Sequence, residues 1–363
     1  MKIQFFRLYT FGFDFDFNFD FIPYFRGMIL VTGGTGLVGS HLLYFLLKEN
    51  EQVRAIHRKN SEIGSVKKVF ALYTSEVDSL YNKIEWVEAN ITEIPALTAA
   101  FDGITKVYHC AAFISFDVSK YRMLKKTNVE GTSNIVNLCL ANKIEKLCYV
   151  SSVATLGSNL HNQLITEETS WNPDEKNSVY AITKYGAEME VWRGTQEGLD
   201  AVIVNPGIIL GTSPEGGGSG VIVSLAASGI PFYPSGAMGI VDVQDVVKVM
   251  IDLMDSETKN EQFILVSENV TYKQLLSKLA PLFGKKPPTK KLSKRTMYFL
   301  SGMDWLSHKF FRTKRRLIKA TVRSMFSTSL YDASKIKNKF VFHFTPTEQT
   351  LERIAKERRK ESN

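Results

Sequence analysis

The stretch MILVTGGTGLVGSHLL, residues Met28–Leu43, has the pattern that decides the fold. It begins with the apolar run Ile29–Thr32, which is typical of a buried parallel strand, and it ends in leucine and valine residues at helical spacing. Between them, Gly33 allows a tight turn, Gly36 lets the backbone approach a pyrophosphate, and Gly39 lets the helix pack closely on the strand. The free N–H groups at the start of such a helix bind phosphate. This order of strand, G-x-x-G-x-x-G and helix therefore predicts a dinucleotide-binding site.

Strands and helices alternate after this stretch, which predicts an α/β fold with a Rossmann-type doubly wound parallel sheet. Further strands are expected at Gln52–His57, Ile84–Glu88, Lys106–Cys110, Lys146–Val150 and Ala201–Val204. Helices are expected at Ser61–Leu80, Ser119–Ala141 and Asn177–Gln196. Beyond Gly211 the pattern loosens around a glycine run at 216–220, so we expect a smaller C-terminal lobe over the carboxyl edge of the sheet, where ligands of such sheets bind.

The length of 363 residues allows more than one domain. We predict a domain at 28–210 that carries the dinucleotide site and the catalytic residues, a substrate-binding lobe at 211–357, and a charged tail at 358–363. Residues 1–27 hold nine of the 24 phenylalanines, many alternating with acidic or small residues. We interpret them as a non-native or disordered extension before a natural start at Met28.

The three cysteines, Cys110, Cys139 and Cys148, lie in apolar segments without the spacing of a metal site. Their odd number argues against a disulfide framework and favours a reducing compartment. We therefore expect a cytoplasmic protein that has no metal centre.

The net charge of +8 is concentrated in the segment Lys285–Arg323, which has thirteen Lys/Arg and one acid, Asp304. One interpretation is peripheral membrane contact through an amphipathic basic helix. The interpretation that we favour at this stage is an element that packs on the lobe and turns a basic face to water. Nucleic-acid binding is not predicted, because no recognition motif accompanies the charge.

Tyr180 and Lys184 form Y-x-x-x-K on a segment with helical periodicity, so their side chains share one face. An ammonium near a phenol favours the phenolate, which lets the tyrosine exchange a proton with a carbonyl or an alcohol. The adjacent hydroxyls Ser151 and Ser152 follow a predicted strand directly. We expect one of them to hydrogen-bond the substrate oxygen.

Together these motifs resemble, in their order, the extended short-chain dehydrogenases/reductases. The resemblance covers Met28 to about Glu357, and it is greatest to the dihydroflavonol-4-reductase and 3β-hydroxysteroid dehydrogenase-like branch. It rests on the glycines together with His109–Ala112, Asn128–Thr132, Ser151–Ser152, Tyr180/Lys184, Asn205–Gly207 and Val241–Asp245. It implies that Ser152 orients the substrate oxygen, Tyr180 is the acid/base, and Lys184 holds the nicotinamide ribose while lowering the pKa of the tyrosine.

The resemblance and the glycine pattern also indicate which residues bind the cofactor. They are Gly33, Thr35, Gly36, Leu37, Val38, Gly39, Arg58, Asn90, Ile91, Ala111, Ala112, Asn128, Ser151, Tyr180, Lys184, Pro206, Gly207 and Ile208. Asn90 stands where this family places an acidic residue near adenine. Residues expected to line the substrate are Phe113, Phe116 and Tyr233.

The end of the second strand distinguishes the two nicotinamide cofactors. An Asp or Glu there accepts hydrogen bonds from the adenosine ribose of NAD, but here the strand ends Ile56-His57-Arg58-Lys59. A guanidinium suits a 2′-phosphate instead. We therefore predict NADP(H) as the preferred cofactor, with NAD(H) as the alternative.

The predicted reaction is hydride transfer between nicotinamide and a lipophilic carbonyl or alcohol through Ser152, Tyr180 and Lys184. Two alternatives stay open, an NAD-dependent nucleotide-sugar epimerase and a non-catalytic NADP-binding regulatory protein. Dehydration is disfavoured because Val153-Ala154, not an acidic pair, follows the serine. The resemblance also implies a homodimer that binds a small-molecule substrate.

Overall fold

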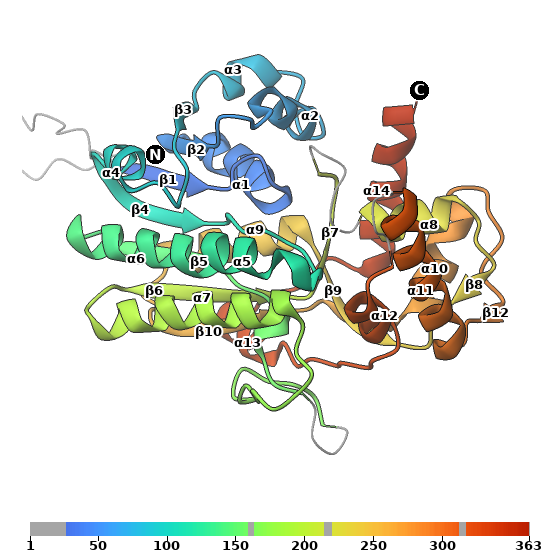
Figure 1. Ribbon diagram of the computed structural model, residues 1–363. Helices are drawn as coiled ribbons and strands as arrows, with labels where there is room; N and C mark the ends of the chain where they lie inside the picture. Colours follow the sequence, from blue (N-terminus) through green and yellow to red (C-terminus); the bar gives the residue numbers. More distant parts are fainter. Residues whose placement is uncertain (1–26, 159–162, 214–219, 312–316, 363) are drawn as a thin grey trace, which may run out of the picture.

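The computed structural model describes residues 27–158, 163–213, 220–311 and 317–362. The extension predicted at 1–27 lies outside the described residues except for Gly27, and the glycine run lies outside them except for Gly220. Figure 1 shows a sheet with helices on both faces, and beside it a smaller lobe that contains much of the C-terminal part of the chain.

Seven parallel strands form the main sheet, in the order β10-β6-β5-β4-β1-β2-β3. Their bounds are β1 Met28–Thr32, β2 Val53–His57, β3 Glu85–Glu88, β4 Ile104–His109, β5 Lys146–Val150, β6 Ala201–Pro206 and β10 Glu261–Leu265. The chain winds outward in both directions from β1, which confirms the Rossmann-type doubly wound sheet. The point of reversal lies between β1 and β4, where such sheets bind ligands. Strand β10 was not among the predicted strands and comes from the C-terminal half.

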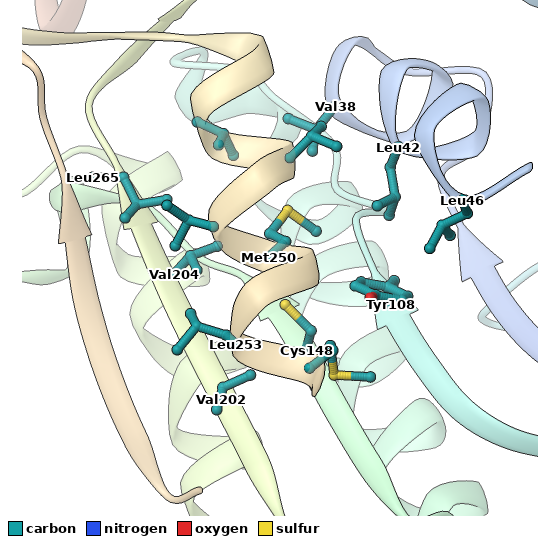
Figure 2. Packing of buried hydrophobic residues seen from close by; sticks show 14 of the residues in the cluster. Val38, Leu42, Leu46, Tyr108, Cys148, Val202, Val204, Met250, Leu253 and Leu265 are labelled. Carbon is teal, nitrogen blue, oxygen red and sulfur yellow. The ribbon is translucent and has the colours of Figure 1, made fainter. Parts of the chain in front are cut away.

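Helices cover both faces of this sheet. Helix α1 (Leu37–Lys48) and helix α9 (Val243–Asp255) pack on one face, and α4 (Ile94–Ala100), α6 (Gly131–Ala141) and α7 (Val179–Gln196) pack on the other. Figure 2 shows Met250 and Leu253 of α9 above Val202 and Val204 of β6. Burial on both faces explains why the central strands β1, β5 and β6 are largely apolar runs.

The lobe is built on a three-stranded sheet, β11-β9-β7, and a two-stranded pair, β12-β8. These strands are β7 Ile208–Leu210, β8 Phe232–Tyr233, β9 Ala237–Asp242, β11 Glu268–Thr271 and β12 Lys290–Lys291. The helices of this half are α8 Gly220–Ala227, α10 Tyr272–Leu282, α11 Lys294–Phe311, α12 Lys319–Met325, α13 Ser334–Phe340 and α14 Thr347–Ser362. Leu210, Leu275 and Leu351 lie in its apolar core, whereas α13 returns to the main sheet beside β10.

The helix predicted at Ser61–Leu80 is interrupted in the structure. The segment forms a 3-10 turn at Ile63–Ser65, helix α2 (Val66–Phe70) and helix α3 (Val77–Tyr81). The break between α2 and α3 places Tyr73 against Tyr44 of α1, with their rings stacked at 4.4 Å. Tertiary packing of these rings therefore overrides the helical periodicity that the sequence shows.

The helix predicted at Ser119–Ala141 is irregular too. It consists of a 3-10 turn at Val118–Lys120, helix α5 (Tyr121–Leu124), a π-helical turn at Lys125–Glu130, and α6. The π-helical turn carries Asn128, whose contacts are part of the site.

At the other end of the chain, residues 358–362, expected as a charged tail, continue helix α14. In the ranges described, no helix is both long enough and apolar enough to span a bilayer.

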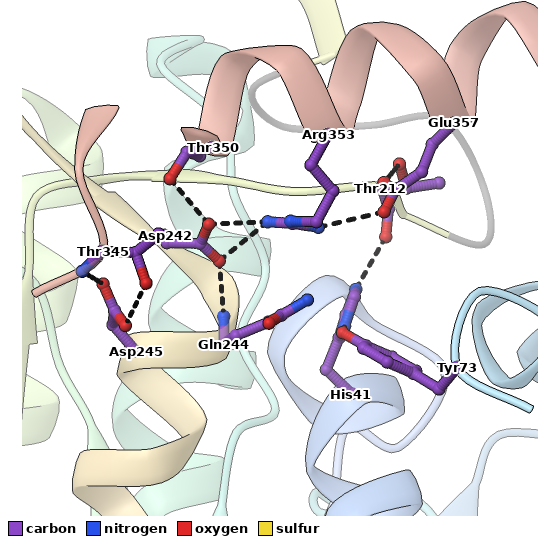
Figure 3. A network of polar contacts seen from close by, with 10 residues as sticks. All are labelled: His41, Tyr73, Thr212, Asp242, Gln244, Asp245, Thr345, Thr350, Arg353 and Glu357. Carbon is purple, nitrogen blue, oxygen red and sulfur yellow. Dashed lines mark hydrogen bonds and ion pairs between the residues drawn. The ribbon is translucent and has the colours of Figure 1, made fainter. Parts of the chain in front are cut away.

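A polar network joins α14 to the start of α9 and to α1, as Figure 3 shows. The carboxylate of Asp242 accepts hydrogen bonds from Arg353 at 2.7 and 2.8 Å and from Thr350 at 2.7 Å. Arg353 also pairs with Glu357, which accepts a hydrogen bond from Thr212. The carbonyl oxygen of Thr212 lies 2.9 Å from Nε2 of His41, on α1. The network thus links the C-terminal helix to the helix that follows the glycine loop.

Candidate active site

The glycine loop has the backbone geometry that the sequence predicts. Gly33 has φ +70°, a left-handed conformation that favours glycine, and a Cβ there would lie 2.7 Å from the backbone nitrogen of Ala111. A Cβ on Gly39 would lie 2.2 Å from the carbonyl oxygen of Gly33, so α1 packs directly on the turn. Gly36 is the N-cap of α1 and provides no capping side chain. The first-turn N–H groups of Leu37 and Val38 therefore fit a pyrophosphate.

Arg58 follows β2 and is exposed. Its backbone N–H donates to Ser61 Oγ at 3.2 Å. Within the described ranges, no carboxylate forms an ion pair with its guanidinium. Arg54, four residues earlier in the sequence and on β2, instead forms an ion pair with Glu85 at 2.9 Å. The guanidinium at the end of β2 is therefore that of Arg58.

Asn90 and Ile91 follow β3. The side-chain oxygen of Asn90 accepts hydrogen bonds from the backbone N–H and the hydroxyl of Thr92, which holds the turn together. Ile91 is buried, and its carbonyl oxygen accepts a hydrogen bond from Asn134 of α6 at 2.9 Å. These contacts place both residues at the carboxyl edge of the sheet.

Ala111 and Ala112 follow β4, at the point where the sheet reverses. The N–H of Ala111 donates to Thr32 Oγ1 at 3.1 Å, and this contact holds the backbone beside the glycine loop. Asn128 connects this loop to α7: it accepts from the N–H of Phe113 at 2.7 Å and donates to Thr183 Oγ1 at 3.2 Å. Asn128 therefore positions the helix segment next to Lys184.

Ser152 and Tyr180 lie together at the end of β5. Ser152 Oγ accepts a hydrogen bond from the N–H of Ala154 at 3.1 Å. Burial raises the pKa of Tyr180, and a side-chain hydrogen bond with Ser152 lowers it in part. The ring of Phe116 lies 5.6 Å from that of Tyr180. An apolar ring therefore borders the predicted acid/base.

Lys184 is buried, and it has two protein contacts that the sequence did not indicate. Its ammonium donates to the hydroxyl of Tyr149 at 2.6 Å and to the carbonyl oxygen of Val150 at 2.8 Å. Burial lowers the pKa of Lys184 to about 7, although the carboxylate of Glu188 acts to raise it. The pKa of Tyr180 is shifted by burial and by the hydrogen bond with Ser152. Lys184 is not among the groups that shift this pKa.

The residues behind Lys184 form a buried polar chain that the sequence did not indicate. Tyr149 is hydrogen-bonded to Thr132, whose hydroxyl lies 3.0 Å from Nε2 of His109. Nδ1 of His109 lies 2.7 Å from the hydroxyl of Thr32 at the end of β1. Burial lowers the pKa of His109 to about 3, so this imidazole is neutral at physiological pH. The alternation of strand residues does not reveal such a chain, because its members come from four separate elements.

Ser151 is turned away from Tyr180. Its hydroxyl donates to the buried carboxylate of Glu188, which also accepts from Thr155 at 2.8 Å and from Asn205 at 2.9 Å. Glu188 lies one helical turn after Lys184 on α7, and sequence reasoning did not select it. Ser151 and Glu188 therefore join α7 to the end of β5, and Ser152 carries the hydroxyl that faces Tyr180.

The remaining predicted residues lie on the lobe side. Pro206 ends β6, Gly207 donates its N–H to the carbonyl oxygen of Leu265 at 3.0 Å, and Ile208 begins β7. Tyr233 lies on β8 beneath the ammonium of Lys273 and packs on the core of the lobe, unlike Phe116. Among the described residues, no three His, Cys, Asp or Glu side chains are grouped as a metal site requires.

Comparison with known proteins identifies the family of the chain. Residues 29–265 match the model of the NAD dependent epimerase/dehydratase family. A putative dihydroflavonol 4-reductase of Synechocystis sp. is 31% identical over 71% of this chain and 73% of its own length. Sterol demethylase protein B of Methylococcus capsulatus is 29% identical over 79% of this chain and 84% of its own.

Among solved structures, UDP-glucose 4-epimerase of Thermotoga maritima superimposes with a TM-score of 0.71 over 93% of this chain and 100% of that chain. The two sequences are 20% identical, so this likeness concerns the fold. The family match covers most of the chain and includes the glycine loop and the Ser152, Tyr180 and Lys184 positions. The chain therefore belongs to the NAD dependent epimerase/dehydratase family, within the extended short-chain dehydrogenases/reductases, and is an NAD(P)-dependent oxidoreductase.

Proposed function

We propose that this protein uses NADP(H) to interconvert a lipophilic carbonyl compound and its alcohol. The observation that carries the proposal is the side-chain hydrogen bond between Ser152 and Tyr180, with Lys184 buried one helical turn after Tyr180 on α7. The putative dihydroflavonol 4-reductase of Synechocystis sp., named as a reductase, supports the same class of reaction.

In the proposed mechanism, Ser152 donates a hydrogen bond to the carbonyl oxygen, and Tyr180 delivers the proton to that oxygen during reduction. When bound, the cofactor supplies the hydride. Lys184 retains donor capacity beyond its two protein contacts, because an ammonium has three N–H groups. We assign the remaining N–H to the ribose. The hydrogen bonds to Val150 and Tyr149 hold the ammonium in place, which supports this assignment.

The substrate class is inferred from the side chains that border Tyr180. The ring of Phe116 lies against it, and Phe113 is fixed nearby by both backbone bonds to Asn128. Apolar rings favour a lipophilic substrate.

NADPH is expected to bind more tightly than NADH by about 1–3 kcal/mol, the scale of a charge-assisted contact between Arg58 and a 2′-phosphate. The measurement is titration of each cofactor into the wild type and Arg58→Ala. The exposed Lys48→Ala, at the far end of α1, is the control. Equal affinities, or a preference that Arg58→Ala leaves unchanged, would contradict this assignment.

The affinity for NADPH should decrease as pH rises above 7. The free protein loses the ammonium proton of Lys184 near its pKa of about 7, and we expect the charged form to bind the cofactor. The dissociation constant should therefore increase by about tenfold per pH unit between 7.5 and 9. His109, with a pKa of about 3, and His41, with a pKa of about 4, remain neutral throughout this range. In Lys184→Met binding should be weak and independent of pH, and a pH slope retained there would assign the effect to another group.

A homodimer is expected through the helical face formed by α5 and α7. Tyr121 and Met123 of α5 and Ile182 and Met189 of α7 are large apolar side chains that are exposed in one protomer. Sedimentation velocity should give a dimer in the wild type and a monomer in Ile182→Glu/Met189→Glu. A wild type that sediments as a monomer at micromolar concentration would remove the dimer without affecting the catalytic proposal.

The test of the proposed function is oxidation of NADPH in the presence of aryl aldehydes, apolar ketones and nucleotide sugars. We expect turnover with the apolar carbonyl compounds. Conversion of a nucleotide sugar with bound NAD would favour the epimerase, and binding of NADPH without any turnover would favour the regulatory protein.

A further inference from the structure

Helix α11 turns a stripe of large apolar side chains to the solvent. Phe299, Met303, Leu306 and Phe310 follow one another at intervals of four, three and four residues, which places them on one face of a helix. Their exposed fractions are 69%, 53%, 47% and 70%. Exposed apolar surface of this extent on a single helix marks an interaction site.

The opposite face of α11 holds the helix in this orientation. Met297 and Ser301 are buried, and the hydroxyl of Ser301 donates to the carbonyl oxygen of Leu317 at 2.7 Å. The N–H of Leu317 in turn donates to Asp304 at 3.2 Å. Figure 1 shows α11 beside α12 in the lobe, away from the main sheet. The stripe therefore cannot turn inward without breaking these bonds.

Basic side chains accompany the stripe. Arg295 and Lys309 are exposed on the same helix, and the ammonium of Lys309 lies 5.2 Å from the ring centre of Trp305, which is also exposed. On β12, Lys290 lies over the exposed ring of Phe232. The only acid in Lys285–Arg323 is Asp304, which is engaged with Leu317.

The apolar stripe of α11 and the cations beside it indicate which partner this face binds. A second copy of the chain docked on the same face would bring the two sets of cations together. An anionic lipid surface attracts these cations, and its headgroup region accepts apolar and indole side chains at the same depth. We infer that α11 docks the protein on an anionic membrane surface, with Phe299, Met303, Leu306 and Phe310 inserted at the boundary between headgroups and acyl chains.

The experiment is cosedimentation of the full chain with phosphatidylglycerol/phosphatidylcholine vesicles and with phosphatidylcholine vesicles, at low and high salt. The test variant is Phe299→Ser/Phe310→Ser. The matched control is Ile94→Ser/Val341→Ser, which removes two large exposed side chains from α4 and from the end of α13. Since all four side chains are exposed, both variants should have the thermal unfolding midpoint of the wild type.

We expect the wild type to bind the anionic vesicles alone, and we expect salt to weaken this binding. Binding should be reduced at least about tenfold in Phe299→Ser/Phe310→Ser and unchanged in the control. A second measurement uses the fluorescence of Trp305, which is exposed on α11. Brominated phosphatidylglycerol should quench the fluorescence of the wild type, and Trp305→Phe should remove that quenching, since the other tryptophans, Trp86, Trp171 and Trp192, lie in the dinucleotide-binding domain.

Absence of binding to anionic vesicles at low salt would overturn the inference. So would equal binding by the wild type and Phe299→Ser/Phe310→Ser. Self-association that this variant abolishes, without vesicle binding, would assign the face to a second copy of the chain. All three results leave the catalytic proposal unaffected, because they do not involve Tyr180 or its neighbours.

Discussion

Tyr180→Phe should reduce kcat by about 10²–10⁴-fold, the usual contribution of a positioned general acid. The substitution removes the hydroxyl that pairs with Ser152 and retains the ring that packs near Phe116. The dissociation constant for NADPH should remain close to that of the wild type, because the lost group acts on the substrate oxygen and contributes little to ground-state binding. Single-turnover kinetics together with cofactor titration measure both quantities.

The control is Tyr185→Phe, which removes a hydroxyl from the same helix. The ring of Tyr185 is stacked on Trp171 at 4.6 Å, so its position is held by other contacts. We expect wild-type kcat for this variant and a reduced kcat for Ser152→Ala. Turnover by Tyr180→Phe at the rate of the wild type would show that another group provides the proton.

Arg353→Met should lower the free energy of unfolding by about 3–5 kcal/mol, because it leaves a buried carboxylate without its cation. The side chain of Asp242 is 1% exposed and receives two hydrogen bonds from Arg353, as Figure 3 shows. Thr350 and the N–H of Gln244 remain as donors, so the carboxylate keeps part of its hydrogen bonding. Urea unfolding of the full chain measures the loss.

Lys278→Met is the matched control for this prediction. Lys278 also pairs with α14, through Glu348 at 2.8 Å, but this pair is open to solvent, with side chains 34% and 62% exposed. An exposed pair contributes about 0–1 kcal/mol. The double variant Asp242→Asn/Arg353→Met should recover part of the stability that Arg353→Met loses, because no unpaired charge remains. If Arg353→Met and Lys278→Met were equally stable, the network would not be the link between α14 and the Rossmann domain.

The part of the fold near the glycine loop follows from local sequence. Gly39 has a steric requirement that the strand–turn–helix itself imposes, Gly33 has the positive φ that the turn needs, and the apolar central strands are buried on both faces. Strand β10 was missed because Glu261–Leu265 lies far from the other strands in the sequence, in the half that was expected to form the smaller lobe. The interrupted helix at Ser61–Leu80 was missed because its break depends on Tyr73 meeting α1.

The placement of Tyr180 and Lys184 on one helix could be predicted, but the partners of Lys184 could not. The Y-x-x-x-K spacing places Tyr180 and Lys184 on one helix face, yet burial and a neighbouring strand decide where the ammonium points. Tyr149 and Glu188 enter the site through tertiary packing, for which the sequence has no periodic signal.

The orientation of helix α11 in the basic segment could not be predicted from the sequence either. The face of α11 that packs on its neighbours agrees with the interpretation favoured from sequence, but its outward stripe is apolar, not basic. Which side of an amphipathic helix faces the protein depends on bonds such as that from Ser301 to Leu317.

The central claim is net hydride transfer from NADPH to an apolar carbonyl compound. The most direct test uses NADPH deuterated at the reactive nicotinamide carbon, with the alcohol product analysed by mass spectrometry. The account predicts one deuterium on the new carbinol carbon for each NADPH oxidised, and loss of this product in Tyr180→Phe. Conversion of UDP-glucose to its C4 epimer without net oxidation of the cofactor, and no deuterated alcohol from any carbonyl compound, would contradict it.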